Sequence, residues 1–447
     1  MQLSIIKNIC SVKLFILLVA VSLLNSCKKQ DHMPPTATKE SADVVYDWYK
    51  LAKRIQLNTT PPPVVIANNR AFGYIGVGLY EAVRPGIKGA VSLSTYLYQM
   101  PAMPAPQMQK DYLWRASANA ALASLFRQFL VGLTDANKAS IDSLENAYND
   151  RFKLSTSDAV ISRSQAYGRA VASVIYNWST TDNFNLSPEG YTLPVYPGAW
   201  EPTPPAFLPP VGPFLKDSRP FLPSSLTATL PPPPVPYSED PSSAFYQAAK
   251  EVYDVGKALT DEQKATANFW ADVGGVGVGF PPPEHILNVV TDVLEDEGAR
   301  LGKAAEVYAK TGIVMKDAFI IIWRAKYQYN LLRPVTYINR DIDPAWMTYL
   351  PTPPYPEYPS GLAGIVTPVM QILIREFGDI PVTDDTYVER GLPARHYGSI
   401  SELIEEAAIS RLYAGIHYRF TQNATIVQGK ELGNRIADIN LIKDSKY

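Results

Sequence analysis

The chain has 447 residues, which is more than one core usually organises, so two packed subdomains are expected. Its 41 basic and 43 acidic residues give a net charge of −2, which excludes a general field that would attract nucleic acid or an anionic membrane. Any anion site must therefore be local.

The first residues resemble a bacterial export signal. Within residues 1–26, two lysines precede an apolar run from Leu14 to Leu24, which is too short to span a bilayer comfortably. The Leu-Asn-Ser-Cys sequence ending at Cys27 is similar to a lipobox, whose cysteine becomes the lipidated N-terminus. An ordinary secretory signal with a chance cysteine is the alternative. We expect a lipid anchor in the cell envelope as the only membrane contact, followed by a tether over residues 27–40.

Residues 41–186 are predicted to form an N-terminal helical subdomain. From Val44 to Ile55, apolar residues fall at spacings that make one helical stripe. Between Asn68 and Val83, small and bulky residues mix in a way that suits close helix-to-helix contact, although three glycines weaken the helical signal. Further helices are expected at about 108–130, 134–152 and 158–178.

In residues 187–241 the helical period gives way to repeated prolines, so the backbone there must be extended or turned. A disordered linker is one interpretation. However, the segment contains Tyr191, Trp200, Phe207 and Phe221, more aromatic residues than disordered segments usually have. We favour an ordered belt laid over the helical body.

Residues 242–442 are predicted to form a C-terminal helical domain. Its longest helix is expected over about 299–332, ended by Pro334, and others at about 360–377, 399–420 and 425–440. No segment has a convincing strand alternation. The fold class is therefore all-α.

Two cations stand near the end of the long predicted helix. Lys326 and Arg333 are seven residues apart, which returns to nearly the same helical face. The pair can therefore point into one pocket. A solvated basic face is the alternative.

A second candidate piece follows a turn-rich approach. Ser360 and Gly361 open an apolar helical run, where unpaired N–H groups, a hydroxyl and a close backbone approach can bind an anion. Ser360 can also be a simple helix cap.

The third piece lies in the helix predicted to start near Ser399. Arg411 and His417 are six residues apart, roughly 120° around that helix, so they share only a wide site. A core histidine is the alternative reading of His417.

The three pieces together resemble, in order and approximate separation, the three-part signature of the vanadium haloperoxidase and type-2 phosphatidic acid phosphatase superfamily. The Phe-Trp-Ala-Asp sequence ending at Asp272 and the sequence from Gly415 to Phe420 look like its soluble bacterial haloperoxidase-related branch. The resemblance extends over residues 42–440, and it implies haloperoxidase-like helical bundles carrying the proline-rich belt.

The resemblance also implies a site. In that family a phosphate or vanadate is held by one lysine, two arginines, a serine hydroxyl and a glycine N–H, which here are Lys326, Arg333, Arg411, Ser360 and Gly361. The last histidine, here His417, is the vanadium ligand or the phosphoryl-accepting nucleophile. The ligand would be a small oxyanion or phosphate ester, and the cofactor would be vanadate for a haloperoxidase and none for a phosphatase.

Two positions depart from the family pattern. Leu362 replaces a histidine that acts as general acid or base, and Thr421 replaces an aspartate that orients the last histidine. We expect Thr421 to accept the Nδ1–H of His417 instead. His285 and His396 are the spare imidazoles outside the tether, and His396 is the candidate substitute acid.

Three functions remain open from the sequence. The first is an enzyme, either a peroxide-dependent haloperoxidase or a phosphatase, with turnover reduced by Leu362. The second is a weakened oxyanion-binding protein, and the third is a structural surface lipoprotein that uses the proline belt for recognition. No nucleotide-binding or Gly-x-Ser-x-Gly motif is present, and the four histidines cannot support a histidine-rich zinc site.

Overall fold

A computed structural model describes residues 36–57, 65–272 and 281–442. The predicted leader and Cys27 lie outside these residues. Within the described ranges, no helix has both the length and the apolar character needed to cross a bilayer.

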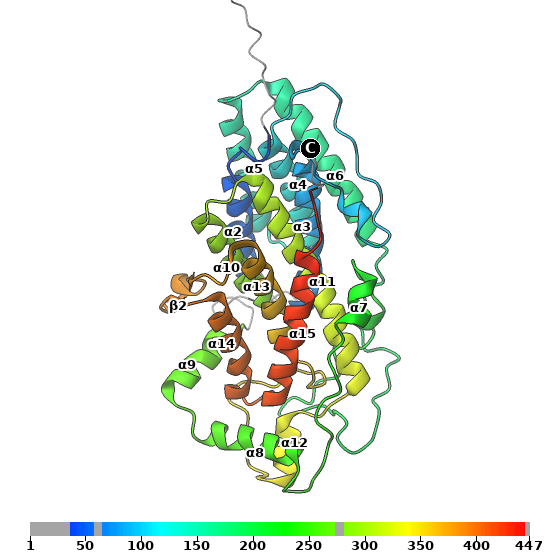
Figure 1. The fold of residues 1–447 in the computed structure, drawn as a ribbon, viewed down its shortest axis with the longest axis vertical. Coiled ribbons are helices and arrows are strands. Elements are labelled where there is room, and N and C mark those ends of the chain that lie inside the picture. Colours follow the sequence, from blue (N-terminus) through cyan, green and yellow to red (C-terminus); the bar gives the residue numbers. More distant parts are fainter. Residues whose placement is uncertain (1–35, 58–64, 273–280, 443–447) are drawn as a thin grey trace, which may run out of the picture.

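The N-terminal half supplies one end of an elongated helical body (Figure 1). Its helices and short 3₁₀ turns are α2 (Asp43–Leu57), α3 (Val65–Val83), η1 (Arg84–Gly86), η2 (Leu93–Thr95), α4 (Trp114–Phe129), α5 (Asp135–Lys153) and α6 (Asp158–Ser179). Helix α5 begins at the expected Thr134 cap, whose hydroxyl accepts the Asn137 N–H at 3.1 Å.

The C-terminal half supplies the other end, where α8 and α12 lie farthest from α5 and α6 (Figure 1). Its elements are α8 (Ala244–Lys257), α9 (Asp261–Phe269), α10 (Pro282–Asp296), α11 (Leu301–Tyr329), α12 (Pro334–Asp341), α13 (Ala363–Phe377), β1 (Val382–Asp384), η4 (Val388–Arg390), β2 (Arg395–Tyr397), α14 (Ile400–Tyr413) and α15 (Arg419–Ala437). Strands β1 and β2 form a small antiparallel hairpin that the sequence did not predict. The all-α class is confirmed, since these six residues are the strands of the described chain.

The two halves meet where α3 packs along α11. A Cβ added at Gly76 would lie 2.3 Å from the Tyr308 carbonyl oxygen, and one added at Gly312 would lie 2.8 Å from the Phe72 carbonyl oxygen. Both helices therefore need glycine to approach this closely. The expectation of close helix contact between Asn68 and Val83 is confirmed, and the segment is helical throughout.

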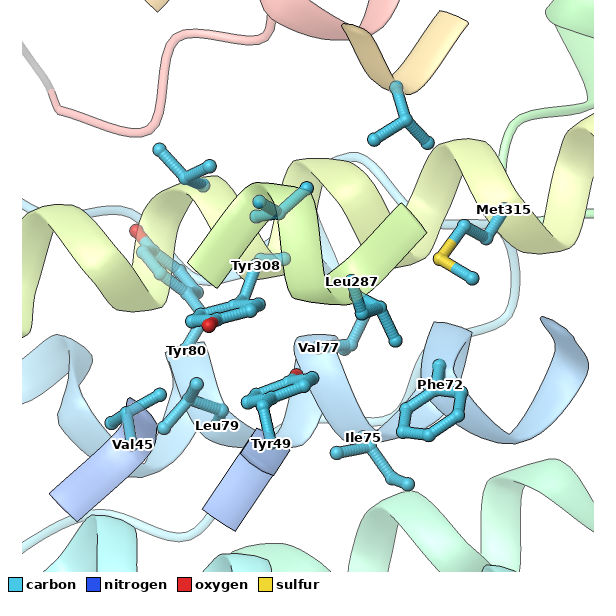
Figure 2. Close-up of a cluster of buried hydrophobic side chains, with 14 of the residues drawn as sticks. Val45, Tyr49, Phe72, Ile75, Val77, Leu79, Tyr80, Leu287, Tyr308 and Met315 are labelled. Atoms are coloured by element: carbon cyan, nitrogen blue, oxygen red, sulfur yellow. The ribbon is translucent and has the colours of Figure 1, made fainter. Parts of the chain in front are cut away.

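Aromatic side chains fill the space around this contact. Tyr49 of α2 stacks on Tyr308 of α11 with ring centroids 3.8 Å apart. Figure 2 shows these rings beside Phe72, Leu287 and Met315, which come from α3, α10 and α11. One continuous core therefore joins the elements on both sides of the long helix.

The proline-rich segment is an ordered belt. It contains only η3 (Leu215–Asp217) and α7 (Pro223–Ala228) as helical pieces. The Val211 carbonyl accepts the Trp323 Nε1–H at 3.0 Å, and both oxygens of Asp317 accept N–H groups of the belt, at Phe221 and Leu222. Since Trp323 and Asp317 belong to α11, the belt is fastened to the helix that leads to the candidate site.

Two helix boundaries differ from the prediction. Helix α11 ends at Tyr329 because Asn330 adopts a left-handed conformation with φ of 45°, and Pro334 begins α12 rather than ending α11. The predicted helix over 399–420 stops at Tyr413, after which Gly415 turns the chain at φ of 79°. Lys326 and Arg333 therefore do not lie on one helix. Arg411 and His417 do not share a helix either.

The packed fold also begins earlier than the predicted end of the tether at residue 40. The Ala37 N–H donates to the Gly86 carbonyl at 2.9 Å, and the side chain of Glu40 accepts the N–H groups of Trp114 and Arg115 at the start of α4. Ala37 and Glu40 are both buried because these contacts hold them against the bundle. The other subdomain boundaries stay a prediction.

Candidate functional site

The candidate site is a cavity of about 390 Å³ between α3, α11, α13 and α14. Three of the six residues of the predicted oxyanion signature, Gly361, Arg411 and His417, line it. The remaining three, Lys326, Arg333 and Ser360, are fully buried next to it. The structure therefore brings together residues separated by more than ninety positions.

His417 is held between α14 and α15 by a carboxylate. Its Nδ1 lies 2.7 Å from Oε1 of Glu357, and the same oxygen accepts the Tyr418 N–H at 3.1 Å. Since the carboxylate is the acceptor, His417 carries its proton on Nδ1 and presents the lone pair of Nε2. Burial, together with Arg333 and other nearby cations, keeps the pKa of His417 well below its usual value.

Thr421 does not act as expected. Its hydroxyl donates to Oε2 of Glu357 at 2.9 Å, so it orients the carboxylate and does not accept from the ring of His417. Burial raises the pKa of Glu357 to about 7, against the opposing pull of Arg333 and Lys326. The orienting carboxylate thus comes from the segment before α13, and not from the position four residues after His417.

Arg333 lies on the Nε2 side of the His417 imidazole. Its Nη1 donates to the Ile416 carbonyl at 2.9 Å and lies 3.4 Å from Nε2 of His417. Its Nε donates to the Tyr355 carbonyl at 3.0 Å, while Nη2 is buried without a hydrogen-bond partner. An unpaired buried guanidinium nitrogen beside an imidazole lone pair favours an anionic ligand at this position.

Lys326 takes a different role from the predicted one. Its ammonium donates to the carbonyls of Pro356, Glu357 and Pro359 at 2.8, 3.0 and 2.5 Å, which uses all three of its protons. Burial, with Arg333 nearby, lowers the pKa of Lys326 well below its usual value. Lys326 therefore braces the segment that leads to Ser360.

Ser360 and Gly361 lie one turn before α13. The Ser360 N–H donates to the Thr425 hydroxyl at 3.1 Å, and its own hydroxyl accepts the Ala363 N–H at 3.4 Å, so the serine also caps the helix. A Cβ on Gly361 would meet the Tyr355 hydroxyl at 3.9 Å as its nearest neighbour. The backbone at Gly361 thus faces open space of the cavity.

Arg411 reaches the cavity from the last turn of α14. Its Nη1 donates to the Trp270 carbonyl at 2.6 Å. The Trp270 indole is fixed in turn, because its Nε1–H donates to Glu406 at 2.9 Å. Arg411 is therefore oriented by the residue that follows α9, and it adds a second guanidinium to the site.

The rest of the cavity wall is apolar. Leu362, where the sequence resemblance predicts a family histidine, lines the cavity with Ile365 one turn later. The other apolar and aromatic lining residues are Val65, Ile66, Val211, Trp270, Phe319, Trp323, Tyr355 and Ile416. Leu362 therefore gives no proton-transfer group to this wall.

The two spare histidines lie elsewhere. His396 is exposed on β2, and its Nδ1 pairs with the Thr383 hydroxyl at 2.9 Å, so the structure does not bring this candidate acid to the cavity. His285 is buried between Oδ1 of Asp272 at 2.8 Å and Oδ2 of Asp384 at 2.7 Å. Burial alone would lower the pKa of His285, but the two carboxylates raise it to about 10.

Glu357 and Tyr355 were missed as site residues from the sequence. Glu357 is the only acidic residue in the proline-rich approach from Pro351 to Pro359, and a buried carboxylate there could have signalled a partner for a histidine. Tyr355 gave no signal, since the same approach contains a second tyrosine, Tyr358, which donates its hydroxyl to the belt carbonyl of Pro232.

Comparison with known proteins agrees with this geometry. A family model described as the VCPO second helical-bundle domain matches residues 306–441. Vanadium chloroperoxidase from Curvularia inaequalis is 24% identical over 464 aligned residues, covering 81% of this chain and 75% of that protein. A bacterial vanadium-dependent chloroperoxidase in its holo form has the same fold, with a TM-score of 0.60 at 18% identity over 83% of this chain and 91% of that one.

The crystal structure of the first bacterial vanadium-dependent iodoperoxidase is more similar. It superimposes with a TM-score of 0.81 at 31% identity, covering 92% of this chain and 99% of that one. The similarity extends through α3, α11, α13 and α14, which carry the cavity, since it includes nearly the whole of both chains. The chain therefore belongs to the vanadium haloperoxidase superfamily.

Proposed function

We propose that this protein is a vanadate-dependent haloperoxidase that oxidises a halide with hydrogen peroxide, with iodide as the first candidate. The observation that carries the proposal is the neutral His417, whose Nε2 faces the Arg333 guanidinium at 3.4 Å. The relative that is 31% identical is an iodoperoxidase, and iodide is the most easily oxidised of the common halides.

The residues present fit vanadate. Nε2 of His417 would be its protein ligand, and the buried, unpaired Nη2 of Arg333 would donate to one of its oxygens. Arg411 and the open backbone at Gly361 would hold the others, and these fixed donors cost no reorganisation when charge develops. When bound, vanadate supplies the Lewis acid that activates hydrogen peroxide for attack by halide.

Turnover is proposed to be lower than in a relative that keeps the histidine. Leu362 cannot transfer a proton, and the loss of a general acid typically costs about 10²- to 10⁴-fold in rate. Anion binding should be much less affected, because the cations that dominate it are in place.

Vanadate titration and peroxide-dependent iodide and bromide oxidation on one purified sample test the proposal. We expect vanadate binding and measurable iodide oxidation, both lost in His417→Gln. Phosphate-ester hydrolysis without halide oxidation would support a phosphatase, and vanadate binding without either reaction would support an oxyanion-binding protein. A wild-type protein that binds no vanadate would overturn the proposal.

We also propose that the protein is a lipoprotein of the cell envelope. The proposal is supported by the lipobox-like sequence that ends at Cys27 and by the apolar run before it. The described chain begins to pack by Ala37, so about ten residues would separate the lipid from the fold.

A further inference from the structure

Tyr355 is fixed against the two cations of the site. Its carbonyl accepts the Arg333 Nε–H at 3.0 Å. Its ring centroid lies 5.1 Å from Cζ of Arg333 and 5.0 Å from Nζ of Lys326. Cations at this distance from an aromatic face are attracted to it, so both the backbone and the ring of Tyr355 are held in place.

The hydroxyl of Tyr355 lies beside Gly361, whose backbone is proposed to hold the oxyanion. It is the nearest atom to a Cβ built on Gly361, at 3.9 Å, and both residues line the cavity. Burial raises the pKa of Tyr355, which keeps its proton on the oxygen, while Arg333 and Arg411 act in the opposite direction. These cations would stabilise a phenolate that forms during a reaction.

The other titratable side chains of the site have partners of their own, except Oδ2 of Asp272, which lies in the cavity wall without one among the described residues while Oδ1 accepts from His285 and Tyr387. Glu357 is engaged by His417 and Thr421, and His285 is held on both ring nitrogens by carboxylates. His396 is exposed on the hairpin. Among the described residues that line the cavity, Tyr355 combines a transferable proton with a position beside Gly361.

We propose that the Tyr355 hydroxyl is the proton-transfer group of this site and takes the place of the imidazole that Leu362 does not provide. The inference rests on the proposed function. With an oxyanion bound, the Tyr355 hydroxyl would give its proton to a departing hydroxide, which would leave as water. The Tyr355 phenolate would then take one proton back from the entering hydrogen peroxide, so the exchange would consume no net proton.

Tyr355→Phe tests the inference, because it removes one oxygen and keeps the ring that Arg333 and Lys326 contact. We expect the turnover rate for iodide oxidation to fall by about 10²-fold. We expect vanadate affinity, measured by calorimetric titration, to fall by only about tenfold, the effect of one hydrogen bond to a charged group. Tyr329→Phe is the matched control, since its hydroxyl donates to the Pro231 carbonyl outside the cavity.

A second change separates proton transfer from structure. Adding Leu362→His to Tyr355→Phe should restore at least about tenfold of the lost rate, because an imidazole then faces the same oxyanion. Tyr355→Phe with wild-type turnover overturns the inference. Equal losses of affinity and rate that Leu362→His does not restore also overturn it, since the hydroxyl would then only bind the oxyanion. Vanadate titration of the wild-type protein comes first. If the wild-type protein binds no vanadate, the proposed function itself is overturned before any variant is compared.

Discussion

Nδ1 of His417 lies 2.7 Å from Oε1 of Glu357, a residue 60 positions earlier in the chain. The contact fixes the tautomer of the imidazole and turns its lone pair toward Arg333. It also joins the segment before α13 to the start of α15. One carboxylate therefore fixes the orientation of the imidazole and holds these two segments together.

Glu357→Gln should weaken vanadate binding by about 10- to 100-fold, because a neutral amide makes Nε2 of His417 less basic and holds the ring less firmly. Calorimetric titration with vanadate measures the change. Glu251→Gln is the control, since Glu251 pairs with Arg419 at the surface. Unchanged affinity in a folded Glu357→Gln protein would contradict the orienting role.

Gly361→Ala should weaken vanadate binding without changing stability, whereas Gly76→Ala should reduce the stability of the fold. A Cβ at Gly361 enters the cavity without a close contact, so the melting temperature should be kept while vanadate affinity falls. A Cβ at Gly76 meets the Tyr308 carbonyl oxygen at 2.3 Å, so unfolding should become easier by roughly 1–3 kcal/mol. Thermal unfolding with and without vanadate distinguishes the two, and a less stable Gly361→Ala protein would show that this backbone is not open.

The contribution of His285 to the free energy of unfolding should decrease as pH rises. The folded pKa of about 10 lies above the unfolded value near 6.5, so the stabilisation is complete below about pH 6.5 and is lost as pH rises through 10. The slope is at most about 1.4 kcal/mol per pH unit in this window. Urea unfolding of wild type and His285→Gln at several pH values measures it. A stability difference that does not shrink between these limits would contradict the charged histidine.

Leu362→His should raise the rate of iodide oxidation while vanadate affinity changes little, and the gain should be larger in Tyr355→Phe than in wild type, where the Tyr355 hydroxyl is proposed to transfer the proton. The side chain at this position already lines the cavity, so an imidazole there would stand beside the bound oxyanion. Steady-state rates and vanadate titration on the same sample test this, with Ile365→Val as a control on the same wall. A rate that stays at the wild-type level with vanadate bound would show that proton transfer is not limiting.

Cys27→Ala should release the protein from membranes, because no other lipid attachment is proposed. Membrane fractionation follows the release, and mass spectrometry of the mature N-terminus identifies the modification. An unmodified mature N-terminus at any residue other than Cys27 would contradict the lipoprotein proposal.

The helical class and the periodic helices could be predicted from the sequence, because apolar spacing reports which face of a helix is buried. The helix boundaries near the site could not. Arg333 precedes Pro334 in a new helix because Asn330 turns left-handed, and no local pattern distinguished this turn from a continuing helix. His417 lies between two helices for the same reason, since Gly415 reverses the chain before it.

Residue type and order alone indicated which residues resemble the oxyanion signature and that Leu362 stands where a histidine is expected. The partners of each residue follow only from the packed fold. It gave the ammonium of Lys326 to three backbone carbonyls, paired His417 with Glu357, and set the Tyr355 hydroxyl beside Gly361. Hydrogen-bond partners that are distant in the chain depend on how the helices pack, and local sequence patterns do not report that packing.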